Sequence, residues 1–209
     1  PQHINMLHDA ILKQCDQNDG VKDSIINDPS DCKFNFDALP LCKGNVQGEN
    51  CFTENQIAAL KKIYDGINLG HGISYPGFPP GGEGEAGGWN SWITGSGAGI
   101  LRRDYPSSQA YFGIEVYKYL ILQDPDWDYT KYDFKGYEKE IRYAASYLDA
   151  TSTDYSGFRN RNGKIIIWHG WNDPALSAYA SIDHYNAVKE KDPEINNYMR
   201  LFLLPGVLH

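Results

Sequence analysis

Lys164-Ile165-Ile166-Ile167-Trp168-His169-Gly170-Trp171-Asn172-Asp173-Pro174 is the stretch of sequence that decides the fold class. Its first five residues form a near-continuous apolar run, which predicts a strand buried in a parallel sheet. Asp173 follows just past the C-terminal end of this strand, where open α/β sheets place their working residues. We therefore predict an α/β fold with a functional loop after the strand.

A second unit of the same kind ends the sequence. Residues 176–190 have helical periodicity, residues 199–204 form another apolar strand, and His209 follows a Pro-Gly turn. An acid after one strand and a histidine after the next match the second half of a Ser…Asp…His hydrolase. We expect Asp173 to orient the imidazole of His209, which would exchange protons with a serine. The alternatives are an ordinary Asp-Pro turn at Asp173 and a frayed terminal histidine.

The nucleophile of such a triad is missing from the sequence. No G-x-S-x-G motif occurs, and Ser96 lies between glycines without the flanking strand and helix of a nucleophile elbow. Two other histidines are alternative candidates for the histidine of the triad. We expect His169, at the end of the strand, to shape the loop through its backbone, and His184 to be a packing or surface residue of the helix.

Composition and cysteine content restrict the class of protein. The net charge of −8 argues against a nucleic-acid partner, and no apolar run is long enough to predict a membrane partner. Four cysteines, Cys15, Cys32, Cys42 and Cys51, fall in the first quarter and indicate two disulfides and a secreted or periplasmic location. Sequential pairing is the simplest, nested pairing stays open, and a Cys₄ zinc site lacks the usual C-x₂-C spacing.

The rest of the sequence divides into helices and a long irregular segment. We predict helices over residues 3–14, 53–64, 107–122 and 136–149, the second of them with a capping box formed by Thr53 and Gln56. Residues 65–99 are so rich in Gly and Pro that we expect no regular element there. Because this segment carries aromatic side chains, we interpret it as a binding loop rather than a linker.

The segment from Cys15 to Ile25 has the composition of a cation site. Three aspartates, Asp16, Asp19 and Asp23, surround a glycine, and hard cations such as Ca²⁺ take carboxylate and carbonyl oxygens. The spacing does not fit an EF-hand, so a different wrap is needed, with the carbonyls of Val21 and Ile25 as further ligands. The alternative is a solvated acidic turn.

Together these motifs resemble the tannase/feruloyl esterase family over essentially the whole sequence. The resemblance implies a structural calcium ion held by Asp16, Asp19, Val21, Asp23 and Ile25, with Asp173 and His209 as catalytic residues. It also implies a partial α/β-hydrolase core with an irregular α+β lid: residues 1–14 as a core helix, 15–155 as a disulfide-bearing lid domain, and 156–209 as the C-terminal part of the core. The serine and oxyanion hole would lie in a missing N-terminal part, which is therefore the expected partner.

The resemblance predicts a serine carboxylic ester hydrolase that acts on small aromatic esters, with galloyl, feruloyl or terephthaloyl groups. From their place in the lid, we expect Trp89 or Trp92 to stack on the ring and Arg102 or Arg103 to meet a carboxylate or phenol. The alternative is a non-catalytic, calcium-stabilised binding module or an inactive fragment, since the sequence has no identifiable nucleophile.

Overall fold

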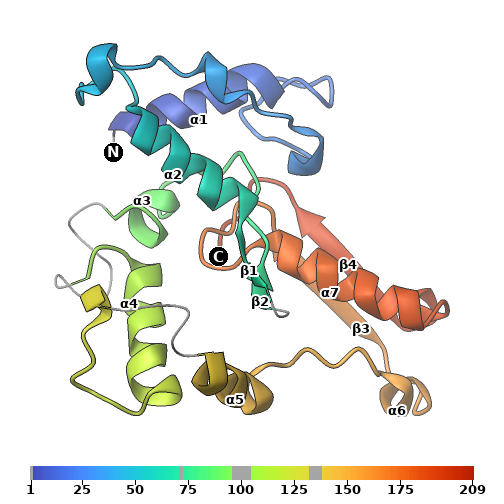
Figure 1. The fold of residues 1–209 in the computed structure, drawn as a ribbon. Helices are drawn as coiled ribbons and strands as arrows, with labels where there is room; N and C mark the ends of the chain where they lie inside the picture. The colour runs from blue at the N-terminus through green and yellow to red at the C-terminus, as the bar shows by residue number, and fades with distance from the viewer. Residues whose placement is uncertain (1, 71–72, 96–104, 132–137) are drawn as a thin grey trace.

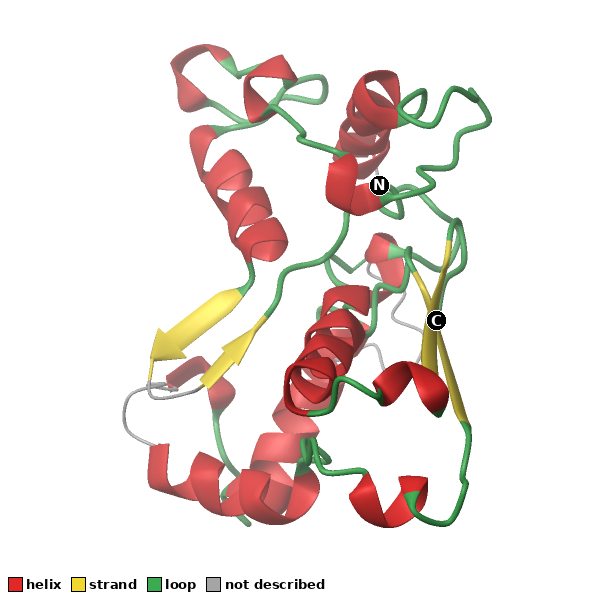
Figure 2. Cartoon of the chain, turned by 90° about the vertical axis from the view of Figure 1, so that its right-hand side faces the viewer, coloured by secondary structure: helices red, strands yellow, loops and turns green. Residues whose placement is uncertain are grey.

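The computed structural model describes residues 2–70, 73–95, 105–131 and 138–209 and shows a mixed α/β fold with two separate two-stranded sheets (Figures 1 and 2). The α-helices are α1 (Gln2–Cys15), α2 (Glu54–Asp65), α3 (Trp89–Trp92), α4 (Ser108–Val116), α5 (Glu138–Leu148), α6 (Ser156–Arg159) and α7 (Ala178–Lys191). The strands are β1 (Ile67–Gly70), β2 (Ile73–Tyr75), β3 (Ile165–Gly170) and β4 (Met199–Leu204). Single turns of 3₁₀-helix occur at η1 (Pro29–Asp31), η2 (Phe36–Ala38), η3 (Lys43–Asn45), η5 (Tyr129–Lys131) and η6 (Ile195–Asn197), and η4 (Tyr117–Ile121) is a π-helical extension of α4. No helix in these described ranges is long and apolar enough to cross a membrane.

The predicted β-α-β unit is confirmed. Strands β3 and β4 are parallel and in continuous register, from Ile165 opposite Met199 to Gly170 opposite Leu204. Helix α7 forms the crossover and begins after Ser177, whose side chain accepts a hydrogen bond from the Tyr179 N–H. The parallel pairing brings the loops that follow both strands to the same edge of the sheet.

The expectation that β3 is buried on both faces is wrong for the part of the molecule described. Its residues alternate between half-buried and exposed, and Ile166 and Trp168 are 73% and 65% exposed. Ile165 and Ile167, on the other face, pack against a buried cluster that includes Val188 of α7. Both faces of β3 carry apolar side chains, which explains the continuous apolar run. The described residues bury only the face with Ile165 and Ile167.

The largest hydrophobic core lies in the first half of the chain. It joins the inward face of α1, Leu60 of α2 and Trp89 of α3 with residues of the irregular segment between the first two helices; its buried members are Ile4, Leu7, Ile11, Cys15, Ile26, Cys32, Leu39, Phe52, Leu60 and Trp89. The capping box predicted for α2 is present, since the Thr53 hydroxyl accepts from the Gln56 N–H and the Gln56 side chain accepts from the Thr53 N–H. Helix α1 therefore shares its core with the segment interpreted as a lid.

The prediction that residues 65–99 contain no regular element is wrong. Strands β1 and β2 pair antiparallel, with Ile67 opposite Tyr75, and α3 adds a helical turn. Ile67 and Tyr75 are residue types that favour strands. The prediction failed because it gave more weight to the many glycines and prolines of the segment than to these residues. The helix predicted over 107–122 is observed as α4 continued by η4. Helices α1, α5 and α7 confirm the other three, predicted over 3–14, 136–149 and 176–190.

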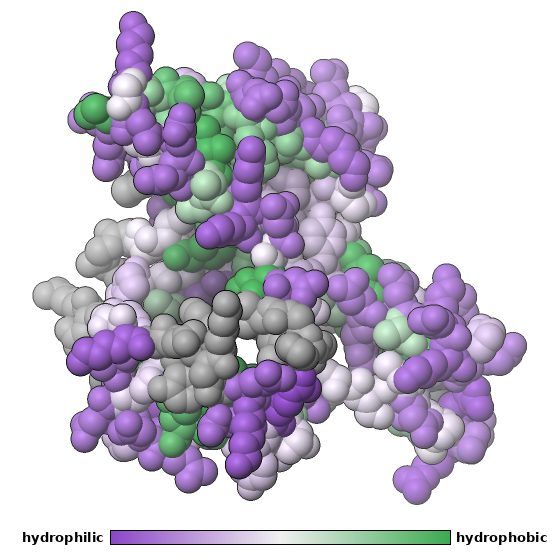
Figure 3. Space-filling view, viewed as in Figure 1, coloured by the Kyte–Doolittle hydropathy of each residue, from purple (hydrophilic) through white to green (hydrophobic). Residues whose placement is uncertain are grey.

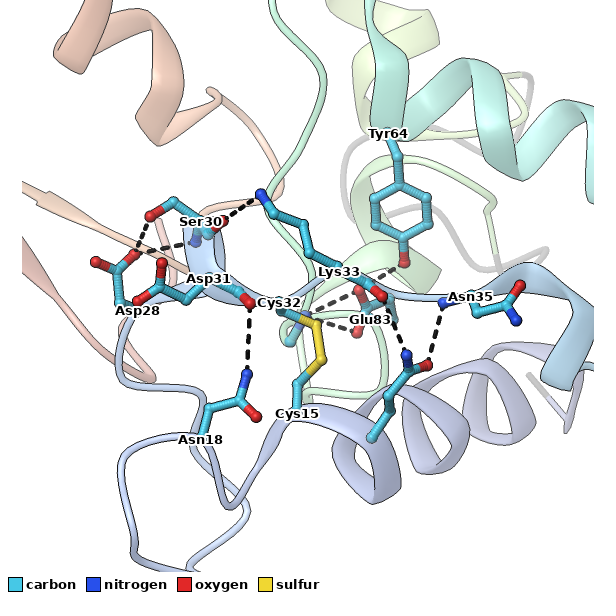
Figure 4. The surroundings of a disulfide bond; sticks show 12 residues. Cys15, Asn18, Asp28, Ser30, Asp31, Cys32, Lys33, Asn35, Tyr64 and Glu83 are labelled. Atoms are coloured by element: carbon cyan, nitrogen blue, oxygen red, sulfur yellow. Dashed lines mark hydrogen bonds between the residues drawn. A yellow bond between two sulfur atoms is a disulfide. The ribbon is translucent and has the colours of Figure 1, made fainter.

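The cysteines form the two disulfides Cys15–Cys32 and Cys42–Cys51, which confirms sequential pairing. Figure 4 shows the first of them beside Glu83, a fully buried carboxylate. Glu83 accepts hydrogen bonds from the Tyr64 hydroxyl at 2.6 Å and from the Gly81 N–H, which satisfies its charge without solvent. Burial, with the adjacent Glu83 charge, raises the pKa of Tyr64 well above its ordinary value, so Tyr64 stays a donor. This network anchors the Gly- and Pro-rich segment to α2.

Candidate active site

Asp173 and His209 meet at the carboxyl edge of the β3–β4 sheet. Nδ1 of His209 lies 2.9 Å from Oδ2 of Asp173, which is a hydrogen bond in which the ring nitrogen donates to the carboxylate. The Asp173 side chain is 7% exposed and that of His209 is 49% exposed. A buried acid that binds Nδ1 leaves Nε2 of the imidazole as the basic nitrogen, which is the arrangement that general base catalysis needs.

The environment of Asp173 favours the carboxylate. Burial is the largest single influence and opposes ionisation, but four polar contacts outweigh it and lower the pKa of Asp173 to about 2. Two are made at Oδ2 by the side chains of His169 and His209, and two are hydrogen bonds from the backbone N–H groups of Ala175 and Leu176 to Oδ1. Asp173 therefore serves both the Asp-Pro turn and the pairing with histidine, since Oδ1 holds the turn and Oδ2 meets the imidazole.

Sequence reasoning missed the side chain of His169. Its Nε2 lies 3.3 Å from Oδ2 of Asp173 and 3.1 Å from the Leu176 carbonyl, and its Nδ1 lies 2.8 Å from the Ser181 hydroxyl. The signal was its alternation with Ile165 and Ile167, which places it on the face of β3 that α7 covers. His184, one further turn along α7, meets the Tyr155 hydroxyl at 3.0 Å and is a packing residue as predicted.

A mostly apolar cavity of about 730 Å³ opens beside His209. Its walls come from α2, the β1–β2 pair, the segment after β2, α3, α4 and the Asp173 loop; lining residues are Lys62, Ile63, Gly66, Ile67, Tyr75, Pro76, Phe78, Trp92, Ile93, Gln109, Phe112, Ala175, Leu176 and His209. Figure 3 shows hydrophobic side chains gathered in the recess below α2. This volume lies in the usual range for small-molecule sites.

The four residues expected to contact substrate lie in different surroundings. Trp92 lines the cavity, where it stacks on Phe112 and meets His209 edge to face. Trp89 is 2% exposed and packs on Tyr64 in the hydrophobic core, away from the cavity walls. Arg102 and Arg103 lie outside the described residues. The structure thus brings Trp92, and not Trp89, together with His209.

Contacts from residues 75–109 hold the Asp173 loop in place. The Gln109 amide of α4 donates to the carbonyl of Pro174 at 2.8 Å. The Ser177 N–H donates to the Tyr75 hydroxyl, and the Ser177 hydroxyl donates to the Gly77 carbonyl. These bonds join the segment expected to be a lid to the residues that follow the acid, so cavity wall and acid form one hydrogen-bonded unit.

The two loops of the site are joined through their backbones. The Asn172 N–H donates to the Val207 carbonyl at 3.0 Å, and the Trp171 N–H donates to the Leu204 carbonyl at 2.9 Å. A Cβ at Gly170 would lie 2.1 Å from the Val207 carbonyl oxygen, so only glycine permits this approach. Gly170 therefore sets the spacing between the acid loop and the histidine loop.

The aspartates of the expected calcium loop differ in their surroundings. Oδ1 of Asp16 is buried and has no hydrogen-bond partner among the described residues, which is costly for a carboxylate and fits a cation ligand. Asp19 and Asp23 each accept a hydrogen bond from a backbone N–H two residues on, that of Val21 and that of Ile25. Across the described ranges, no three His, Cys, Asp or Glu side chains are grouped closely enough to hold a metal ion. Of the three aspartates in this loop, only Asp16 thus has a buried carboxylate oxygen without a partner in the described ranges, and the three do not come together as a ligand set.

Comparison with known proteins identifies close parallels along the whole chain. An uncharacterized esterase of Xanthomonas campestris pv. campestris is 33% identical over 96% of this chain and 38% of its own length. A probable feruloyl esterase B-1 of Aspergillus flavus is 28% identical over 100% of the chain and 38% of its own length. The crystal structure of an esterase from Aspergillus oryzae superposes with a TM-score of 0.81 at 28% identity, covering 100% of this chain and 40% of that one.

These relatives are longer than the chain, which spans about two fifths of the length of those it matches. The superposition shows that its β-α-β unit and helices are part of an esterase fold of the α/β-hydrolase type. The family model described as tannase and feruloyl esterase matches residues 1–209. The chain therefore belongs to the tannase and feruloyl esterase family.

Proposed function

We propose that this chain is part of a serine carboxylic ester hydrolase in which His209 is the general base and Asp173 is the acid that orients it. The observation that carries the proposal is the 2.9 Å hydrogen bond from Nδ1 of His209 to the buried Oδ2 of Asp173, at the wall of an apolar cavity. Membership of a family with esterase relatives supports the reaction class.

The proposed mechanism assigns each group one task. Nε2 of His209 takes the proton of a serine hydroxyl as the serine attacks the ester carbonyl, and returns it to the leaving alcohol. Asp173, ionised at neutral pH because its pKa is about 2, holds the proton on Nδ1 and stabilises the imidazolium as it forms. His209 then activates a water molecule in the same way. The water attacks the acyl-enzyme, and the carboxylic acid product leaves as the serine recovers its proton.

The serine and the oxyanion hole are proposed to lie in another part of the same protein. The exposed face of β3 and β4 supports this, since Ile166, Trp168 and Phe202 are 73%, 65% and 50% exposed. Side chains of this kind on a parallel sheet normally pack against helices. The length of the relatives leaves room for further strands and for helices over this face.

The substrate class is proposed to be esters of aromatic acids. Trp92 and Phe112 offer stacked ring faces 6.0 Å apart on the cavity wall beside His209, and rings prefer such offset contacts. Relatives that are named feruloyl esterases support the same substrate class. Arg102 or Arg103 remains proposed as a partner for a phenol or carboxylate of the substrate.

A structural calcium ion is also proposed, with secretion into an oxidising compartment. Asp16 would be its central ligand, joined by Asp19, Asp23 and the carbonyls of Val21 and Ile25. Bound there, the ion would neutralise the buried carboxylate and cross-link the loop after α1. The two disulfides support an oxidising location.

The test is ester turnover by the complete enzyme that contains this chain, with methyl ferulate as substrate. His209→Ala is expected to reduce kcat by roughly 10³-fold or more, and Asp173→Asn by a similar order, because the triad acts as one unit. His184→Ala, which removes a histidine bound to Tyr155, serves as the control and is expected to turn over normally. Near-wild-type turnover by His209→Ala would overturn the assignment.

A further inference from the structure

His169 lies where it can control the acid without touching a substrate. Residues of β3 alternate between its two faces, and His169 shares the covered face with Ile165 and Ile167. Its side chain is 13% exposed and reaches from the end of the strand toward α7. It is absent from the residues that line the cavity beside His209, so a direct contact with a bound ester has no support.

The hydrogen-bond partners of His169 fix the position of its proton. Nε2 lies near two acceptors, the Leu176 carbonyl at 3.1 Å and Oδ2 of Asp173 at 3.3 Å, so Nε2 carries hydrogen. Nδ1 meets the Ser181 hydroxyl at 2.8 Å, and that hydroxyl can donate to the neutral ring or accept from the charged one. The Nε2–H is therefore present in both charge states of the imidazole.

Oδ2 of Asp173 consequently meets two histidines: it accepts a hydrogen bond from Nδ1 of His209 at 2.9 Å, and Nε2 of His169 lies 3.3 Å away in an ion-pair contact. Oδ1 is held separately by the N–H groups of Ala175 and Leu176. Contacts at both oxygens restrict rotation of the carboxylate, and Nε2 of His169, a ring held to α7 through Ser181, keeps Oδ2 beside His209. The raised pKa of His169, caused first by its hydrogen bond to Asp173, agrees with this coupling.

We propose that His169, held by the Ser181 hydroxyl of α7, is a positioning residue for the acid: it fixes Oδ2 of Asp173 against His209 and shares the charge of the carboxylate. The inference rests on the proposed function of Asp173 and His209. Removing the donor should leave Asp173 freer to rotate and should leave its full charge on His209. A misplaced catalytic group typically costs about 10²-fold in rate.

The test compares two substitutions of one residue in the complete enzyme. His169→Asn places an amide near Nδ1, keeps a partner for Ser181 and loses the Nε2 donor. His169→Gln places an amide N–H near Nε2 and keeps a donor for Asp173. We expect kcat for methyl ferulate to fall roughly tenfold to a hundredfold in His169→Asn, with KM within about twofold because the residue does not line the cavity. His169→Gln should recover most of the loss.

The pH profile separates positioning from a general loss of structure. With Asp173 no longer shared, its charge acts more strongly on protonated His209, so the acid limb of kcat/KM should move to higher pH in His169→Asn and return in His169→Gln. Ser181→Ala, which frees the His169 ring, should show the same displacement more weakly. His184→Asn, on the same helix, controls for the loss of a histidine.

Two results would overturn the inference. One is a His169→Asn enzyme with wild-type kcat and pH profile, and the other is equal impairment of the Asn and Gln variants without displacement of the acid limb. Failure of the proposed function is distinguishable, because it would appear as turnover in His209→Ala. Melting temperatures of all variants confirm that the proteins compared are folded.

Discussion

The indole ring of Trp92 meets the imidazole of His209 edge to face, with ring centroids 5.3 Å apart. Trp92 also lies 6.0 Å from Phe112 in a stacked arrangement, so α3, α4 and the histidine loop share one aromatic cluster. Because Trp92 is far from His209 in sequence, this contact makes the cavity wall part of the support of the proposed base. Substrate fit and base orientation are thereby linked through a single side chain.

Replacing Trp92 tests this link. Trp92→Ala should reduce kcat/KM for methyl ferulate about tenfold, since an aromatic pair contributes about 1 kcal/mol beyond its buried area and the His209 ring loses a contact as well. Trp127→Ala is the matched control, because that indole stacks on Tyr117 and does not line the cavity. Steady-state kinetics of both variants decide, and equal losses would contradict a specific role for Trp92.

Gly170 controls the separation of the two loops. In Gly170→Ala the new methyl group would collide with the Val207 carbonyl, so the histidine loop must move away from Asp173. We expect kcat to fall about a hundredfold, as for a displacement of roughly 1 Å. Gly113→Ala is the control, because Gly113 lies in α4 and a Cβ there meets no atom of the described residues within 4 Å. A Gly170→Ala enzyme within twofold of wild type would show that the loops tolerate the shift.

The elements that sequence predicts well here are those whose signals are local. The apolar strands β3 and β4 and the capping box of α2 all depend on residues within one segment. Pairing of β3 with β4 follows from the crossover rule for parallel strands, and with it the meeting of Asp173 and His209. Each of these needs only periodicity and chain order.

The features that sequence did not predict depend on contacts between distant segments. The sequence alone does not distinguish Trp89 from Trp92. The packing of α3 places Trp89 in the core against Tyr64 and Trp92 at the cavity beside His209. The contact of His169 with Asp173 needs the side chain to point toward α7, which alternation along β3 alone could have suggested. The need for glycine at Gly170 arises from Val207, on a separate loop.

The depressed pKa of Asp173 predicts a pH-dependent contribution to stability. Its pKa falls from an ordinary 3.8 to about 2 on folding, so the carboxylate stabilises the folded state fully above pH 4 and loses this effect as pH falls toward 2. The contribution at neutral pH is roughly 2 kcal/mol. Asp173→Asn should be less stable than wild type by about this amount at pH 7, with the gap closing between pH 4 and pH 2. Denaturant unfolding of both proteins measures it, and a gap that stays constant with pH would contradict the assignment.

The buried oxygen of Asp16 predicts a dependence of stability on calcium. If Ca²⁺ neutralises Oδ1, a chelator should lower the melting temperature of the complete enzyme, and added Ca²⁺ should restore it by mass action. In Asp16→Asn the chelator should have little further effect, since an amide is a poorer cation ligand and carries no charge to neutralise. Asp37→Asn is the matched control, because this exposed carboxylate lies outside the loop and should leave the response intact. Because ester hydrolysis by a serine triad needs no metal, kcat measured below the melting transition should change little on chelation. Identical melting of the wild-type enzyme with and without chelator would sink the calcium proposal.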